Sequence, residues 1–451
     1  MRLLFRHLDA LVVEAGRPPL RDAWLAEDGQ GRVAAAGTGT PPPGLDGGRD
    51  GRGLLAVPGL VNAHHHLYQT AARGRATGQG LFAWLTALYP RWGRLRPATI
   101  HAAAVVALAE LVRSGATATV DHHYLYPPGA GAAAVAEALF GAADQVGIRL
   151  MLARGAITCG RSGGCLPPDE LVEPPDAVWT DIRDLAARYH QRGAAAQTRV
   201  AVAPVSIMST DAAVMRDAAE LARVLNLPLH THAGETRDEE RYARQRYGAH
   251  PFDLLEEWGW LRPGTWLAHG VWIPVRFRPR LARAGVGVAH CPSSNLRLGS
   301  GVAPVRAYLQ AGIPVGLGVD GSASNDGGHL WGEARLALLL SGVRGRPPLA
   351  PAEALALATR GSARCLGWEG LGRLEPGDAA DVAVYRLDDL EHAGMAAGDP
   401  LAAWALGWPT RAWTVLVGGR AVVEEGRLVT VEVEAAAAEL RRRMQAEEAG
   451  G

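Results

Sequence analysis

Lysine is absent from this chain, and its absence removes several kinds of chemistry. All 46 basic residues among the 451 positions are arginine. Schiff-base catalysis on lysine, the P-loop for nucleotide phosphates and the carboxylated lysine that bridges two metal ions each need a lysine side chain. The sequence therefore excludes these three mechanisms.

Cysteine is also scarce: the chain has only Cys159, Cys165, Cys291 and Cys365, with no CxxC spacing among them. Such a set predicts no disulfide framework and fits a reducing compartment. The basic and apolar N-terminal segment is interrupted by Asp9, and no small-residue cleavage site follows, so we do not expect secretion. These features favour a cytoplasmic location.

Long apolar runs and an excess of charge of either sign are missing as well. Nothing approaches the roughly 18 consecutive apolar residues that span a bilayer. The 46 basic residues balance 46 acidic ones, which gives no electrostatic case for nucleic acid or anionic lipid as a partner. We expect a soluble protein that binds neither. The sequence leaves the oligomeric state open, with a homodimer as one option.

Apolar strand-like runs alternate with alanine- and leucine-rich stretches of helical period between residues 56 and 366. This order is typical of a parallel α/β fold. Eight candidate strands can be counted, at 56–61, 116–121, 149–154, 199–205, 227–232, 265–269, 286–290 and 315–320. The count predicts a (β/α)8 barrel of the TIM type, in which the carboxyl ends of the strands carry the chemistry.

Short strand-like runs at both ends of the chain, within 3–36 and 381–431, predict a second and smaller unit. We expect a composite β-sandwich domain from residues 1–57 and 371–435, the barrel at 58–370, and a C-terminal helix or fraying tail at 436–451. The glycine- and proline-rich segment 154–176 is too long for a plain connection. We expect it to form a loop over the mouth of the barrel.

Side chains suited to metal binding stand at the ends of the predicted strands. In the run VNAHHHL, His64 and His66 point the same way because alternate residues of a strand share a face. Further candidates at or just beyond later strands are His232, Glu235, His269 and Asp320. Several imidazoles, a carboxylate and room for a water predict a hydrolytic centre of the zinc type.

The motifs PGLVNAHHH, HTHAGET, LAHG and VDGSASND resemble the metal motifs of the amidohydrolase superfamily, in its deaminase branch. The resemblance spans essentially the whole chain, because GRLEPGDAADVAVY is similar to the segment that closes the family's split β-domain. Longer stretches, among them HHHLYQT, LFAWLTALYPRW and GRSGGCLPPD, most resemble 8-oxoguanine deaminases. The segment VAPVSIMST and the alanine and glycine of HTHAGET depart from that pattern beside the expected pocket.

The resemblance implies that the metal ligands are His64, His66, His232 and Asp320. His230 shares the face of His232 and is its rival, but the family's ligand is followed three residues later by an acid, and only His232 has Glu235 there. Because no lysine is present to bridge a second ion, we expect a mononuclear centre. It would hold one Zn²⁺ per subunit, with Fe²⁺ as the alternative.

Such a site predicts hydrolysis at a ring carbon that bears an amine, and the resemblance implies that the ring is an amino-substituted, purine-like one. The cation would activate a water at neutral pH. His269 would orient that water, Glu235 would carry its proton to the ring, and Asp320 would protonate the departing amine. The first hypothesis is conversion of 8-oxoguanine to urate and ammonia. Guanine, isoxanthopterin or another pterin, and an amino-triazine are alternative substrates, and a non-catalytic scaffold on the same fold is the alternative from another class.

Candidates for binding the ring lie near these motifs. Gln69 stands three residues beyond His66, where purine deaminases of this branch place a glutamine against the ring edge. Aromatic side chains would stack on a flat ring, and polar ones would bind its edge. The candidate substrate-binding residues are Gln69, Trp84, Tyr89, His123, Ser322 and Asn325, with His122 and Tyr124 as further walls.

Overall fold

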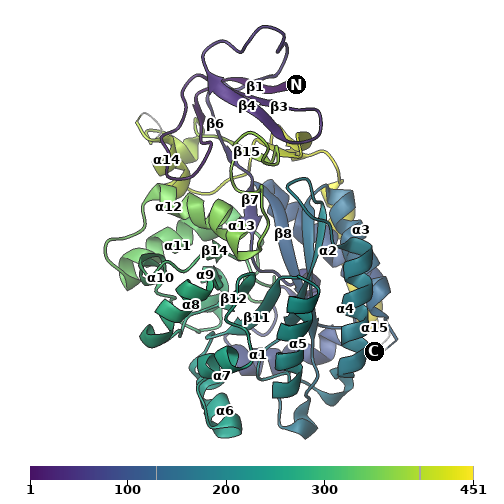
Figure 1. Ribbon diagram of the computed structural model, residues 1–451. Coiled ribbons are helices and arrows are strands. Elements are labelled where there is room, and N and C mark those ends of the chain that lie inside the picture. Colours follow the sequence, from purple (N-terminus) through teal and green to yellow (C-terminus); the bar gives the residue numbers. More distant parts are fainter. Residues whose placement is uncertain (128, 396–397, 450–451) are drawn as a thin grey trace.

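The computed structural model describes residues 1–127, 129–395 and 398–449. A parallel barrel ringed by helices forms the larger part, and a smaller β-rich region lies at one end of it (Figure 1). The first strand lies in the β-rich region, and the last described helix lies at the side of the barrel.

The barrel strands follow one another in chain order around one eight-stranded sheet. They are β7 (Leu60–Asn62), β8 (Ala116–His123), β9 (Arg149–Ala156), β10 (Thr198–Pro204), β11 (Leu229–Ala233), β12 (Thr265–His269), β13 (Gly287–His290) and β14 (Val315–Leu317). Neighbouring strands are parallel, and the backbone N–H of Ala63 donates to Leu317 O at 2.7 Å, which joins the last strand to the first. The predicted (β/α)8 barrel is confirmed.

Helices cover the outside of the barrel and shield its apolar strands from water. The described α-helices are α1 (Leu81–Trp92), α2 (Pro97–Arg113), α3 (Ala132–Val146), α4 (Pro175–Tyr189), α5 (Ala212–Val224), α6 (Arg237–Tyr247), α7 (Pro251–Glu257), α8 (Arg278–Ala284), α9 (Pro292–Arg297), α10 (Val305–Gln310), α11 (Leu330–Arg344), α12 (Pro351–Ala356), α13 (Ser362–Cys365), α14 (Pro400–Leu406) and α15 (Val433–Ala449). Of these, α14 lies beside the β-rich region, and α6 and α7 lie at the opposite end of the barrel. α2 is typical: proline starts it where no amide donor is required, and its leucines and all its alanines except Ala98 are buried.

The β-rich region contains two sheets whose strands come from both ends of the chain, as predicted. The first has the order β4-β3-β1-β5, formed by β1 (Arg2–Leu8), β3 (Ala23–Glu27), β4 (Val33–Thr38) and β5 (Arg49–Asp50). The second has the order β18-β17-β16-β15-β6-β2, formed by β2 (Ala10–Leu11), β6 (Leu54–Pro58), β15 (Val382–Arg386), β16 (Thr414–Val417), β17 (Arg420–Glu424) and β18 (Arg427–Leu428). The antiparallel pairing of β6 with β15 unites the two ends.

The strand predicted at 56–61 is wrong as a single element. The chain forms β6 in the β-rich region, passes Gly59, and then starts β7 in the barrel. A Cβ atom on Gly59 would lie 2.3 Å from Thr117 Oγ1, so only glycine fits where the chain crosses from one sheet to the other. Hydrophobicity continues across this crossing, which is why the two strands read as one.

The β-rich region covers the amino-terminal ends of the barrel strands. Arg149, the first residue of β9, makes a two-armed ion pair with Asp381 at 2.8 and 2.9 Å. The Tyr385 hydroxyl donates to Ser114 O, just before β8, at 2.9 Å. The carboxyl ends of the strands therefore open at the far end of the barrel, toward α6 and α7 (Figure 1).

The C-terminal segment predicted at 436–451 is helical as far as Ala449, and residues 450–451 lie outside the described part. α15 packs along α2 and buries Leu440. None of the described helices has the length and apolar composition needed to cross a membrane. The limits 1–57 with 371–435, 58–370 and 436–451 stay a prediction about which parts fold as separate units.

Candidate metal centre and active site

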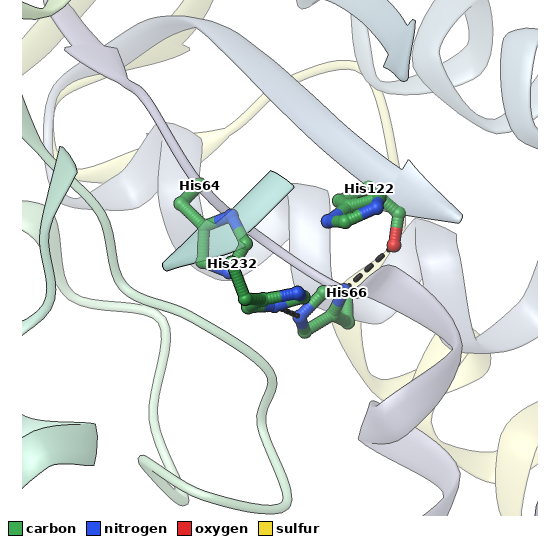
Figure 2. A group of neighbouring side chains, drawn as sticks. All are labelled: His64, His66, His122 and His232. Carbon is green, nitrogen blue, oxygen red and sulfur yellow. Dashed lines mark hydrogen bonds between the residues drawn. The ribbon is translucent and has the colours of Figure 1, made fainter. Parts of the chain in front are cut away.

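Three of the predicted ligand imidazoles converge on one point at the carboxyl end of the barrel. His64 and His66 follow β7, and His232 lies near the end of β11 (Figure 2). His66 Nε2 is 3.2 Å from His232 Nε2. Asp320 Oδ1, just beyond β14, is 3.4 Å from His64 Nε2 and 3.3 Å from His66 Nε2. Residues separated by more than half the chain therefore share one site.

Backbone carbonyl groups determine which nitrogen of two of these rings faces the site. His66 Nδ1 donates to His122 O at 2.6 Å, and His232 Nδ1 donates to Val205 O at 2.8 Å. Because a carbonyl oxygen only accepts, each Nδ1 must carry the ring hydrogen. Each Nε2 then presents a lone pair to the other at 3.2 Å. Two lone pairs that face each other at that distance repel, and a cation between them would turn the contact into an attractive one.

The separations among these atoms fit a metal ion. Ligands placed tetrahedrally at about 2.0–2.1 Å from an ion, as in zinc sites, lie about 3.3–3.4 Å from one another. The measured separations are 3.2, 3.3 and 3.4 Å. In addition, His64 Nε2 is buried and has no hydrogen-bond partner within the described chain. Two overlapping groups also have potential ligand atoms within 4.8 Å of one another, namely His64, His66, His122 and His232, and His64, His269 and Asp320. The arrangement supports a divalent metal at this point.

Burial keeps the imidazoles in the form that binds metal. Removal from water lowers the pKa of His232 to about 3 and holds the pKa of His64 well below its usual value. Burial, partly offset by the nearby Asp320 carboxylate, also lowers the pKa of His66. These rings are therefore neutral at physiological pH and keep a free lone pair.

Asp320 is held in a strained but well-supported conformation. Its backbone φ of 60° is uncommon for a residue other than glycine. Its amide N–H donates to His64 O at 3.0 Å, and the hydroxyls of Ser294 and Ser324 donate to Oδ2 at 2.5 and 3.2 Å. These contacts leave Oδ1 facing the imidazoles. Ser294 was not foreseen, because nothing in the run PSSN that begins α9 marks it as a neighbour of Asp320.

Glu235 and His269 complete the polar side of the site. His269 Nε2 is 3.7 Å from Glu235 Oε2 and 4.0 Å from Asp320 Oδ2. The backbone φ of His269 is 73°, and its Nδ1 is 3.0 Å from Asn295 Oδ1. Burial raises the pKa of Glu235, and Asp320 adds to this while His269 opposes it. A carboxyl group with a raised pKa beside a metal centre suits proton transfer.

A pocket lined by apolar and aromatic side chains opens onto these groups. Its apolar and aromatic walls are Leu81, Trp84, Leu85, Tyr89, Tyr124, Leu166, Val205, Met208 and Leu298. Its polar lining, besides the metal-site residues, consists of Gln69, Ser206, Ser209 and Ser324. Leu166 comes from the predicted loop at 154–176, so that segment does lie at the mouth of the barrel.

Three of the six predicted substrate-binding residues, Gln69, Trp84 and Tyr89, line this pocket. The other three are engaged elsewhere. His123 Nε2 bonds to Leu125 O at 2.9 Å, and the Asn325 amide donates to Val319 O at 2.7 Å. Ser322 Oγ accepts from Thr70 at 3.2 Å. These contacts place them behind the pocket wall, where they shape the loops that carry the site.

Two histidines lie closer to the metal centre than expected. The His122 ring stacks on the His232 ring with centroids 4.8 Å apart, and one of its nitrogens lies within 4.8 Å of a nitrogen of each of His64, His66 and His232 (Figure 2). His230, the rival of His232, instead contacts His64, with His230 Nε2 2.9 Å from His64 Nδ1. The alternation along β8 and β11 puts both rings inside the barrel, but only the three-dimensional arrangement shows their partners.

The expectation that the cysteines stay unpaired is wrong for one pair. Cys159 and Cys165 form a disulfide within the loop that follows β9. Cys291 and Cys365 are free and buried. The sequence did not reveal the bond because the partners stand six positions apart with no recognisable motif, and the path of the loop brings them together.

Comparison with known proteins agrees with this geometry. The model of the Amidohydrolase family matches residues 55–422. The chain is 46% identical over 384 residues to an 8-oxoguanine deaminase from Pseudomonas aeruginosa, which covers 84% of this chain and 85% of that protein. It is 35% identical to an isoxanthopterin deaminase from an unknown prokaryotic organism, over 91% of this chain and 89% of that one.

A solved structure shares the whole architecture. An atrazine chlorohydrolase from Arthrobacter aurescens TC1, crystallised with zinc, superimposes with a TM-score of 0.92 at 34% identity, covering 98% of this chain and 100% of that one. Taken with the family match and the converging ligands, this shows that the chain belongs to the amidohydrolase family.

Proposed function

We propose that this protein is a metal-dependent deaminase of an amino-substituted purine-like ring, and that it converts 8-oxoguanine and water to urate and ammonia. The convergence of His64, His66, His232 and Asp320 beside Glu235, at the bottom of an aromatic-walled pocket, carries the proposal. The similarity to deaminases of amino-substituted heterocycles supports the same reaction. Membership of the amidohydrolase family makes the chain a hydrolase, as predicted.

We further propose one Zn²⁺ per chain, held by His64, His66, His232 and Asp320, with Fe²⁺ as the alternative. Nitrogen and oxygen ligands with room for a water suit either ion, and the zinc in the related chlorohydrolase favours the first. When bound, such an ion lowers the pKa of a water so that the water can attack at neutral pH.

The protein's own side chains direct the protons of the reaction. Glu235 takes one proton from the attacking water and delivers it to the ring nitrogen beside the carbon under attack. Asp320 passes the second water proton to the amine, which leaves as ammonia while an oxo group takes its place. His269, 4.0 Å from the Asp320 carboxylate, orients the water by hydrogen bonding. Positioned acid–base groups of this kind contribute about 10²–10⁴-fold each.

Gln69, Trp84 and Tyr89 are the proposed binding residues for the ring. Gln69 is buried, and its Oε1 has no hydrogen-bond partner within the described chain. A buried acceptor left unpaired is unfavourable, so the pocket favours a ligand with an N–H at this edge. Trp84 and Tyr89 contribute aromatic rings to the pocket wall. We propose that His123, Ser322 and Asn325 affect substrate binding only indirectly, by holding the loops that carry the site.

Isoxanthopterin is the second candidate substrate, because a deaminase of that ring is 35% identical over most of the chain. Guanine and an amino-triazine remain alternative substrates on the basis of the sequence. Ammonia release from equal concentrations of 8-oxoguanine, isoxanthopterin, guanine and an amino-triazine tests the choice. Turnover of 8-oxoguanine with the highest kcat/KM is expected. Turnover of another ring without activity on 8-oxoguanine would overturn the assignment.

A cytoplasmic location, a place in purine metabolism and a homodimer stay predictions from the sequence. Light scattering on the purified chain tests the last of these.

A further inference from the structure

One of the three ligand rings is oriented differently from the others. His66 and His232 each donate from Nδ1 to a backbone carbonyl. His64 Nδ1 instead meets a second imidazole, with His230 Nε2 at 2.9 Å. An imidazole nitrogen can donate or accept, so this contact alone does not say which nitrogen of His64 carries its hydrogen.

The hydrogen bond on the other side of the His230 ring determines which of the two imidazoles donates. His230 Nδ1 is 2.9 Å from Trp266 O, which can only accept. A fully buried imidazole without a facing carboxylate is neutral and has one ring hydrogen, which the carbonyl places on Nδ1. His230 Nε2 is then bare and must accept. His64 Nδ1 therefore donates, and His64 Nε2 keeps a lone pair for the metal site.

We propose that His230 is a positioning residue that fixes His64 in the tautomer able to bind metal. The inference rests on the proposed metal centre and adds to it a group that does not touch the ion. A partner that orients a metal-binding imidazole also raises its basicity, and loss of such partners lowers metal affinity about 10- to 100-fold.

His230 is itself held firmly. Its ring stacks on the indole of Trp266, with centroids 4.2 Å apart and planes 13° apart. Trp266 Nε1 donates to Ala63 O, next to His64, at 3.0 Å. His64, His230 and Trp266 are all fully buried, so water does not replace the contact if His230 is lost. The cluster thus ties β11 and β12 to the residue that follows β7.

Two substitutions of His230 distinguish the effect of losing its hydrogen-bond acceptor from the effect of losing its volume. His230→Phe keeps a stacked ring but removes the acceptor. His230→Gln offers an amide oxygen that can accept from His64 Nδ1. His250→Phe is the matched control, because His250 is also buried and stacked on an aromatic ring, Phe277, at 5.3 Å, without contact to any proposed ligand.

Each protein is stripped of metal and titrated with zinc against a chromophoric chelator, and the melting temperature of the metal-free form is recorded. We expect zinc affinity to fall about 10- to 100-fold in His230→Phe, to recover most of that loss in His230→Gln, and to stay at the wild-type value in His250→Phe. Wild-type affinity in His230→Phe, or equal losses in the Phe and Gln variants, would overturn the proposal.

If His230→Phe does not fold, a measurement on the wild-type protein still tests the proposed tautomer of His64. In ¹⁵N-histidine spectra of the metal-free protein, the signal missing from a His64→Gln variant identifies His64. It must show the hydrogen on Nδ1, and a hydrogen on Nε2 contradicts the inference. If wild-type protein binds no zinc at all, the proposed metal centre is wrong. That outcome differs from zinc binding that does not change when His230 is replaced, which would contradict only the role of His230.

Discussion

Individual hydrogen bonds decide what the metal-site side chains can do. Two carbonyl groups place the hydrogens of His66 and His232 on Nδ1, and two serine hydroxyls hold the Asp320 carboxylate so that Oδ1 faces the rings. Glu235 has no such role in holding an ion. It lines the pocket beside His269, and burial raises its pKa, which supports the proposed role in proton transfer.

Replacing Glu235 by glutamine should lower kcat by about 10²–10⁴-fold while the metal content stays unchanged. The amide keeps the volume of the carboxylate but cannot carry a proton from water to the ring. Ammonia release under saturating substrate, together with metal analysis of the same samples, checks this. A variant with near-normal kcat would show that another group moves the proton.

The pH profile should carry the signature of the same residue. Burial raises the pKa of Glu235 above its usual value of 4.5. The ionised form is the base, so kcat/KM should fall as the pH drops through this raised pKa, giving an acid limb above pH 4.5. The residual activity of Glu235→Gln should lack that limb. An identical limb in the variant would assign it to a different group.

Elements, more than single residues, determine how well the sequence predicts the site. His64, His232, His269 and Asp320 were predicted together because the carboxyl ends of parallel barrel strands meet at one end of the molecule. His230 could not be placed in the same way. It shares a face with His232, and only the pairing of β11 with β12 shows that it lies deeper and meets His64.

The pairing of Cys159 with Cys165 was missed for a related reason, since loops have no period that sequence patterns can reveal. This loop matters to the pocket. Leu166 follows Cys165 directly, lines the cavity, and donates its N–H to Met208 O at 3.2 Å. The disulfide thus anchors a wall against which the ring would pack.

Substituting both Cys159 and Cys165 by serine should raise KM several-fold and change kcat less, because the wall loses its anchor while the metal ligands keep theirs. Steady-state kinetics with metal analysis measures this. Wild-type protein treated with a reductant should behave like the double variant. An unchanged KM in both would show that the loop keeps its shape without the bond.

At the scale of the whole molecule, a buried ion pair is one of the contacts that join the barrel to the β-rich region. Arg149 and Asp381 are almost fully buried and paired through two bonds, and Asp381 also accepts from the Gly418 amide at 2.7 Å. The sequence predicted the two regions but not their join, because charged residues 232 positions apart carry no sign of being partners.

Arg149→Met should lower the free energy of unfolding by about 3–5 kcal/mol, because it leaves the Asp381 carboxylate buried without its partner. Arg216→Met is the control, since Arg216 and Glu257 form an exposed pair whose loss should cost about 1 kcal/mol or less. Urea denaturation followed by circular dichroism compares them. Equal losses would mean that the buried pair does not hold the two regions together.

Zinc titration of the metal-stripped protein, with ammonia release from 8-oxoguanine as the readout, examines the metal centre and the reaction at once. Activity should be absent without metal, return in proportion to added zinc, and level off at one equivalent per chain. His64→Gln and Asp320→Asn variants should not recover in the same range. Full activity in the stripped protein, or none after zinc is restored, would contradict a deaminase built on these four ligands.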